Sequence, residues 1–295
     1  MRALARSDAS AKRVAELGAE PVRGDILDRA SLASAAMGAD VSFHLAAHLG
    51  EWGAWTDFER GNVEGTRNSL AACAEAGVRR FVHCGTEAAL MAGKPLIHVD
   101  ETAPLQPDSR APYPATKARA EQEVRDANRD GFETVVVRPR FVWGKGDTTL
   151  LPGMVETVEA GKWAWVGGGG NVTDTAHVDN VVEGLVLAAE KGRPGESYFV
   201  TDGEPTTFRE FVTALLETQG VKPPDRNLPA WTAAPMARIC EMAWRLLPLK
   251  GDPPMTTFRS WLLTQECTID ISKARAELGY SPIVTHEQGL AELAE

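Results

Sequence analysis

Arg80-Phe-Val-His-Cys-Gly-Thr86 is the stretch that decides the fold, because it is typical of a buried β-strand running into a loop of small residues. Such a strand presents the Thr86 hydroxyl at its carboxyl end, the edge at which α/β sheets bind ligands. A polar connection leads to Ala111-Pro-Tyr-Pro-Ala-Thr-Lys117, where prolines suited to a helix start precede good helix formers. The two stretches predict a strand, a loop and a helix of an α/β fold.

Tyr113 and Lys117 are four residues apart, so on a helix they share one face. An ammonium about 5 Å from a phenol, at an effective dielectric of about 20, favours the phenolate by roughly 3 kcal/mol, or about two pKa units. We therefore expect Lys117 to lower the pKa of Tyr113. With the Thr86 hydroxyl, the three groups suit redox chemistry between a carbonyl and an alcohol. The alternative interpretation of the pair is an exposed helix start.

Composition limits the classes of function. Forty-one acidic against 31 basic residues give a net charge of −10, which argues against general nucleic-acid binding and favours a small-molecule partner. No apolar run of about 18 residues occurs, so we predict no transmembrane segment. The four cysteines lack metal-type spacing and suit reduced thiols in the cytoplasm. His44 and His48 flank a predicted strand end without a third ligand, so we predict no metal.

Short β-type runs alternate with helical stretches over the first 200 residues, as a doubly wound parallel sheet requires. The predicted strands are 2–5, 20–23, 40–45, 79–84, 134–138 and 197–200, and the predicted helices are 9–17, 29–37, 59–76, 114–129, 151–160 and 178–190. From Thr207 the chain becomes mostly helical, which suggests a smaller lobe that holds substrate. In this lobe the amphipathic stretch 230–249 has three interpretations: lobe core, wall of an apolar pocket, or membrane-surface contact.

Several motifs in this order resemble the extended short-chain dehydrogenase/reductases, the epimerase/dehydratase superfamily. They are Gly24-Asp-Ile-Leu27, His44-Leu-Ala-Ala47, Asn62-Val-Glu-Gly-Thr66, Thr86, the Tyr113/Lys117 pair and Arg138-Pro-Arg-Phe-Val-Trp-Gly144. The run Gly167 to Asn180 resembles the 3β-hydroxysteroid and sterol dehydrogenase branch. The resemblance implies an α/β, Rossmann-like fold with a dinucleotide-binding domain at 1–142 and 176–200 and a mostly helical substrate lobe at 143–175 and 201–295.

The resemblance also implies roles for individual residues. Tyr113 would be the acid/base, Lys117 would tune it and bind the nicotinamide ribose, and Thr86 would bond the reacting oxygen. Further cofactor contacts are implied for Arg6, Asp25, Ile26, Leu45, Ala46, Ala47, Pro139 and Val142, and substrate contacts are hypothesised for His48, Glu87, Arg140 and Trp143. Arg6, after the second strand of the family, favours NADP, whereas the branch often uses NAD, so the cofactor is NAD or NADP.

The start of the chain lacks a feature that a dinucleotide fold requires. Met1-Arg-Ala-Leu-Ala-Arg-Ser7 resembles the family's second strand, so the first strand, its glycine-rich turn and its helix have no counterparts. Because that strand lies at the centre of the sheet, we expect a gap between its neighbours and an unstable chain. We hypothesise an internal methionine, a fragment or a misassigned start.

The function predicted from these observations is an NAD(P)-dependent oxidoreductase that interconverts a secondary alcohol and a ketone on a bulky apolar substrate, with a 3β-hydroxysteroid or sterol favoured. One alternative is a nucleotide-sugar epimerase or dehydratase, and a second is a non-catalytic cofactor-sensing or scaffold protein. By resemblance we also expect a homodimer formed through 59–76 and 114–129. We expect a cytoplasmic protein, with peripheral membrane contact left open.

Overall fold

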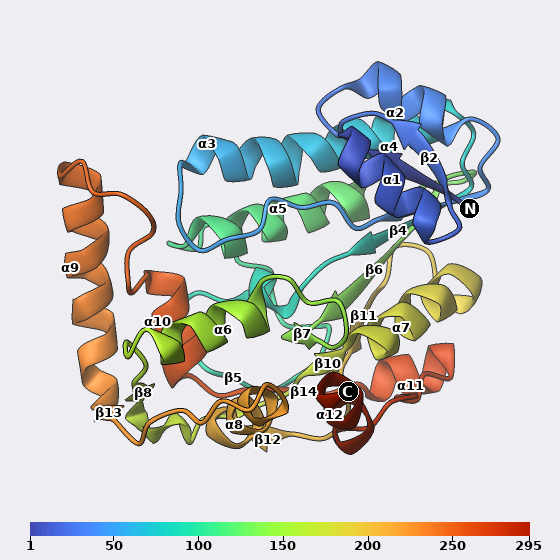
Figure 1. Cartoon of the computed structure of the whole chain (residues 1–295). Helices are drawn as coiled ribbons and strands as arrows, with labels where there is room; N and C mark the ends of the chain where they lie inside the picture. The colour runs from blue at the N-terminus through green and yellow to red at the C-terminus, as the bar shows by residue number, and fades with distance from the viewer.

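The computed structural model describes residues 1–295, and a parallel sheet of four strands lies at its centre (Figure 1). The strand order is β11-β6-β4-β3. These strands span Val41–His44 (β3), Arg80–Cys84 (β4), Glu133–Pro139 (β6) and Ser197–Val200 (β11). In β4, β6 and β11 the β-branched and aromatic residues are buried on both faces, as a parallel sheet covered by helices requires. The predicted α/β doubly wound fold is confirmed.

Helices cover both faces of this sheet (Figure 1). On one face lie α4 (Gly65–Glu75) and α5 (Pro112–Asp126), and on the other lie α7 (Val178–Lys191) and α11 (Ser272–Leu278). The predicted helix 59–76 is interrupted, because α3 (Trp55–Phe58) continues into a π-helical turn, Glu59–Glu64, before α4 begins. In that turn Asn62 is buried, and its side chain bonds both backbone groups of His48 and the Thr116 hydroxyl.

The first two strands form a sheet of their own. β1 (Arg2–Ala5) pairs only with β2 (Glu20–Arg23), and β3 pairs only with β4. The associated helices are α1 (Asp8–Glu16) and α2 (Arg29–Ala36), and neither contains a buried residue. β3 therefore carries Val41 and Phe43 half-exposed at an unpaired edge. This is the gap in the sheet that the sequence predicts.

A second, mixed sheet was not predicted. It joins segments that are far apart in the chain, in the order β12-β9-β14-β5. Its strands are β5 (Leu96–Val99), β9 (Val172–Thr173), β12 (Thr206–Thr207) and β14 (Cys267–Ile269). Two further short parallel pairs are β7 (Val142–Trp143) with β10 (Ala176–His177), and β8 (Trp165–Val166) with β13 (Asn227–Leu228). All of these strands except β5 have only two or three residues, which is too little pattern to be recognised locally.

The remaining helices surround these short strands and close the cavity end of the molecule. They are α6 (Leu150–Glu159), α8 (Phe208–Thr218), α9 (Ala233–Leu246), α10 (Thr257–Thr264) and α12 (His286–Ala294), with short 3₁₀ turns at Glu87–Leu90, Gly167–Gly169 and Ala230–Thr232. α9 stands at the edge of the molecule farthest from β1 and β2 (Figure 1). Only Ala233 and Ala237 of α9 are buried, so the interpretation of 230–249 as lobe core holds only for its inner side.

Candidate active site

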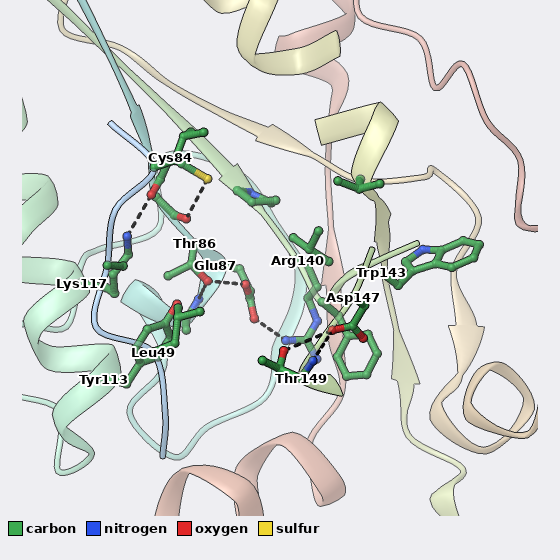
Figure 2. Close-up of a pocket in the computed structure, with 18 of the residues that line it drawn as sticks. Leu49, Cys84, Thr86, Glu87, Tyr113, Lys117, Arg140, Trp143, Asp147 and Thr149 are labelled. Atoms are coloured by element: carbon green, nitrogen blue, oxygen red, sulfur yellow. Dashed lines mark hydrogen bonds and ion pairs between the residues drawn. The ribbon is translucent and has the colours of Figure 1, made fainter. Parts of the chain in front are cut away.

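A cavity of about 480 Å³ lies at the carboxyl ends of β4 and β6 (Figure 2). This is the edge at which α/β sheets bind ligands. Most of the predicted site residues line it, namely Leu45, Ala47, Thr86, Glu87, Tyr113, Lys117, Pro139, Arg140, Val142 and Trp143. Strand ends, the loop after β4 and the first turns of α5 therefore bring the predicted hydroxyl, phenol and ammonium into one cavity.

Tyr113 and Lys117 lie on the first turns of α5, which begins at Pro112 with a proline at its first position. Both side chains face the cavity, and Lys117 is almost fully buried. The Lys117 ammonium donates a hydrogen bond to the backbone carbonyl of Cys84 at 2.9 Å (Figure 2). This bond connects α5 to the end of β4, so the charge of Lys117 is held at the strand end.

The expected fall in the pKa of Tyr113 is not found, and that expectation was wrong for this structure. Burial of the phenol raises its pKa above the ordinary value, and the Glu87 carboxylate raises it further. Helix spacing identified the lysine, but the desolvation of the phenol and the carboxylate opposite it decide the sign.

Thr86, Glu87 and Arg140 form a buried hydrogen-bonded chain (Figure 2). The Thr86 hydroxyl donates to Oε2 of Glu87 at 2.7 Å, and the other carboxylate oxygen pairs with Arg140 Nη1 at 2.5 Å. Arg140 also donates through Nε and Nη2 to the Thr173 hydroxyl. Because its only hydrogen points to Glu87, the Thr86 oxygen can only accept further hydrogen bonds, and one of these comes from the Ala88 N–H at 3.2 Å.

Two buried histidines lie behind Lys117. His44 and His83 are register partners on β3 and β4, and their rings stack with centroids 5.4 Å apart. Burial, and secondly the charge of Lys117, lower the pKa of His44 to about 3 and hold the pKa of His83 well below its usual range. Both rings are therefore neutral at physiological pH.

His48 does not fill its predicted place. Its ring packs edge-on against Phe58, with centroids 4.6 Å apart, and its backbone is held by Asn62. It is absent from the cavity wall. The loop after β3 turns this side chain toward α3 and the π-helical turn, away from the other residues predicted to contact substrate.

The residues implied for the adenine side lie outside the cavity. Arg6 is exposed just after β1, and Asp25 accepts from the backbone N–H of Leu27 at 2.9 Å in the turn after β2. Ile26 packs against Gly65 of α4. Ala46 likewise does not line the cavity. The structure thus brings together the residues implied for the nicotinamide side only.

Several cavity residues were missed by the sequence reasoning. Phe141, between β6 and β7, has a positive φ of 43°, a strained conformation for a residue with a side chain. Phe258 and Leu262 come from α10, and Leu49 comes from the loop after β3. Phe258 lies 5.7 Å from the Tyr113 ring, measured between centroids. Only the tertiary fold places α10 at this wall, so no local signal could have identified these residues.

Comparisons with known proteins agree with this geometry. A model of the 3-beta hydroxysteroid dehydrogenase/isomerase family matches residues 3–230. The chain is 46% identical over 295 residues to a 4-hydroxy-2-methyl-3-oxo-4-farnesyl-3,4-dihydroquinoline-1-oxide ketoreductase of Stigmatella aurantiaca, covering 100% of this chain and 88% of the relative. It is 38% identical over 288 residues to a 2-alkyl-3-oxoalkanoate reductase of Stenotrophomonas maltophilia, covering 94% and 86%.

Among solved structures, dTDP-glucose 4,6-dehydratase from Streptomyces venezuelae with NAD bound has a TM-score of 0.73 at 26% identity, covering 99% of this chain and 85% of that chain. The relatives from Stigmatella aurantiaca and Stenotrophomonas maltophilia are named as a ketoreductase and as an oxoalkanoate reductase. The prediction of an oxidoreductase acting on hydroxyl and ketone groups is therefore confirmed, and the non-catalytic alternative is not supported.

Proposed function

The chain belongs to the 3-beta hydroxysteroid dehydrogenase/isomerase family, and on that premise we propose that it interconverts a ketone and a secondary alcohol on a bulky apolar substrate with NAD or NADP. The observation that carries the proposal is an apolar wall beside the phenol of Tyr113. Phe258 packs on Tyr113, and Leu49, Ala88, Phe141 and Leu262 line the same cavity. Such a wall favours a hydrocarbon substituent close to the reacting oxygen.

The names of the relatives narrow the substrate class. One acts on a 3-oxo compound with a farnesyl group at position 4, and the other acts on a 3-oxo compound with an alkyl group at position 2. In both names the apolar group is carried by the carbon next to the ketone. We propose the same feature for the substrate of this chain, and a 3-oxosteroid is the second member of the class to be tested.

The proton steps follow from the site groups. In the reducing direction the Tyr113 phenol, protonated through neutral pH because its pKa is raised, donates its proton to the substrate oxygen. The oxidising direction reverses this step, so the substrate hydroxyl returns its proton to the Tyr113 oxygen as the hydride leaves the carbon. The Thr86 hydroxyl is held beside the reacting groups by its bond to Glu87. The Glu87 and Arg140 pair therefore orients Thr86 from behind.

The cofactor is proposed to reach the cavity along the ends of β3, β4 and β6. Small residues there, Ala47 and Gly85, leave room for a flat ring beside Pro139. Lys117 and Tyr113 supply hydrogen-bond donors for ribose hydroxyls. When bound, the dinucleotide supplies or accepts the hydride. The choice between NAD and NADP is left to the assay, since Arg6 is exposed and does not line the cavity.

A nucleotide-sugar substrate fits the cavity less well, because a diphosphate needs free cations. Arg140 is paired with Glu87 and bonded to Thr173, and Lys117 is held by the Cys84 carbonyl. Of the cations at the cavity wall, Lys145 alone is exposed and bonded to no other residue. The electrostatics therefore favour an uncharged, apolar substrate over a sugar nucleotide.

The proposal is tested with three substrates: oxidation of NADH and of NADPH by the purified protein is measured with a 2-alkyl-3-oxo compound and with a 3-oxosteroid, and conversion of a UDP-sugar in the presence of NAD is measured by chromatography of its products. We expect turnover with an apolar ketone and none with the UDP-sugar. Tyr113→Phe should lower kcat roughly 10²- to 10⁴-fold, because the general acid is lost.

Tyr198→Phe is the matched control for the loss of a phenol hydroxyl. The Tyr198 hydroxyl donates to the Glu277 carboxylate, and neither residue lines the cavity. The control should keep full turnover. Efficient turnover of the UDP-sugar alone, or full turnover by Tyr113→Phe, would overturn the proposal.

A further inference from the structure

The outward side of α9 is unusual because it is apolar although it faces solvent. Ile239, Met242 and Leu246 of α9 are 62%, 57% and 76% exposed, and Trp231, in the 3₁₀ turn just before the helix, is 77% exposed. Leu247 and Leu249 continue the apolar surface beyond the helix end. Surface helices ordinarily bury their apolar side and expose charges, so this helix has a second apolar face that nothing in the structure covers.

The charges on this face are of one sign. Arg238 and Arg245, seven residues apart, flank Ile239 and Met242, and Lys250 follows the helix. The one acidic residue of α9, Glu241, is turned inward, where it accepts from the backbone N–H and the hydroxyl of Thr257. Asp252 is the first acidic residue after this face. In a protein of net charge −10, a basic and apolar face is a local exception.

The helix that carries this face adjoins an element of the cavity wall. α9 packs against α10, which supplies Phe258 and Leu262 to the cavity wall. The guanidinium of Arg245 lies over the ring of Trp52, 5.5 Å from its centroid, in the loop that also carries Leu49. Glu51 of that loop accepts from Thr256 and from Arg259 of α10. The loop, α10 and α9 therefore form one connected side of the cavity.

We propose that the outward face of α9, from Trp231 to Lys250, docks on the surface of a bilayer that contains anionic lipid. No helix combines the length and the apolar character needed to cross a membrane, so docking would be interfacial. An exposed tryptophan, aliphatic side chains and flanking arginines are the composition of helices that lie in the headgroup region. A second copy of the chain fits less well, because Arg238 and Arg245 would meet arginines without an acidic partner.

The proposed function gives this docking a consequence. If the substrate carries a long hydrocarbon group, it partitions into the bilayer, and docking through α9 brings the cavity mouth close to it. That consequence rests on the proposed function. The docking itself does not, because binding to vesicles is measured without turnover.

The test is flotation of the purified protein with two kinds of vesicle: phosphatidylcholine alone, and phosphatidylcholine in which about a third of the lipid is phosphatidylglycerol. We expect binding to the mixed vesicles that weakens as salt is raised. Met242→Ser with Leu246→Ser should weaken binding about tenfold or more, because two apolar side chains no longer enter the lipid. Arg238→Glu should weaken binding about tenfold, and to the mixed vesicles only.

The matched control is Val182→Ser with Val186→Ser on α7. These valines have the same four-residue spacing and are also exposed, but they lie on another helix. The control should bind as the unchanged protein does, and all variants should keep turnover of a soluble ketone. The proposal would be overturned if the protein did not bind the mixed vesicles, or if the α7 control lost as much vesicle binding as Met242→Ser with Leu246→Ser. A second result would also overturn the proposal. If the protein were a dimer in lipid-free solution and Met242→Ser with Leu246→Ser made it a monomer, the face would be assigned to a second copy of the chain.

Discussion

At the scale of single residues, Glu87 interacts with more of the side chains in the site than Lys117 does. Glu87 receives the hydrogen of Thr86, pairs with Arg140 and raises the pKa of Tyr113. Lys117 instead bonds the Cys84 carbonyl and, together with burial, keeps His44 neutral. Burial and, secondly, the Glu87 carboxylate raise the pKa of Tyr113 and keep the proton on the phenol.

Replacing Glu87 tests this electrostatic role. In Glu87→Gln the charge that raises the pKa of Tyr113 is removed, whereas burial of the phenol remains. Reduction needs the protonated phenol, so its rate falls as the pH rises through that pKa. We therefore expect the alkaline limb of kcat/KM for reduction to move to lower pH, measured as a pH profile beside the unchanged protein.

The same variant should unfold more easily. Arg140, itself buried, would lose its ion partner, and breaking a buried pair from one side costs about 3–5 kcal/mol. Glu59→Gln, which breaks the more exposed pair with Arg119, should cost about 1 kcal/mol or less by the same denaturant titration. An unshifted pH profile in Glu87→Gln would contradict the role given to Glu87.

At the scale of elements, Asp202 after β11 joins segments that are distant in the chain. Its carboxylate accepts from Trp143 Nε1 of β7, from the Thr175 hydroxyl, and from the His177 N–H and Asn180 Nδ2 at the start of α7. His286 of α12 lies 3.2 Å away. Burial alone would raise the pKa of Asp202, but these donors outweigh it and lower the pKa. The cavity wall at Trp143 is thereby fixed to the central sheet.

Asp202→Asn tests this junction. The asparagine amide must direct its two N–H groups at groups that are already donors. We therefore expect the free energy of unfolding to fall by about 3 kcal/mol at neutral pH. Because the folded pKa of Asp202 is lowered, its contribution is complete above the unfolded value of about 4 and is lost as the pH falls through the folded pKa. The difference in Tm between variant and parent should therefore shrink below about pH 4.

Asp225→Asn is the control for the change of aspartate to asparagine. Asp225 is exposed and pairs with Arg209 at the surface. The Tm of Asp225→Asn should match that of the parent at every pH, because exposed ion pairs contribute little to stability. A Tm difference for Asp202→Asn that stayed constant from pH 7 to pH 3.5 would argue against the ionised carboxylate as the source of stability.

At the scale of the whole molecule, the sheet is divided. β1 and β2 carry a small unit whose helices bury nothing, whereas β4 and β6 lie in the core. Backbone amides in a unit with few buried contacts open more often than those in the core. The unit of residues 1–40 should therefore be the least stable part of the protein.

Hydrogen exchange followed by mass spectrometry tests this difference. We expect amides of β1 to exchange at least about tenfold faster than those of β11. Both strands have four residues and a single neighbour in their sheets, but every residue of β11 is buried. Equal protection of the two strands would contradict the assignment of a weakly held unit.

The predicted homodimer is tested by none of these observations and stays a prediction.

The amino-acid sequence by itself determined the α/β fold, the main strands and helices to within a few residues, and the meeting of Thr86, Tyr113 and Lys117. Those features depend on local periodicity and on the rule that parallel strands end at one edge. Only the tertiary structure decided the sign of the pKa shift at Tyr113, the orientation of His48, the second sheet and the exposure of the outer face of α9. Each of these depends on which distant groups come together, because desolvation, charge and burial act through space.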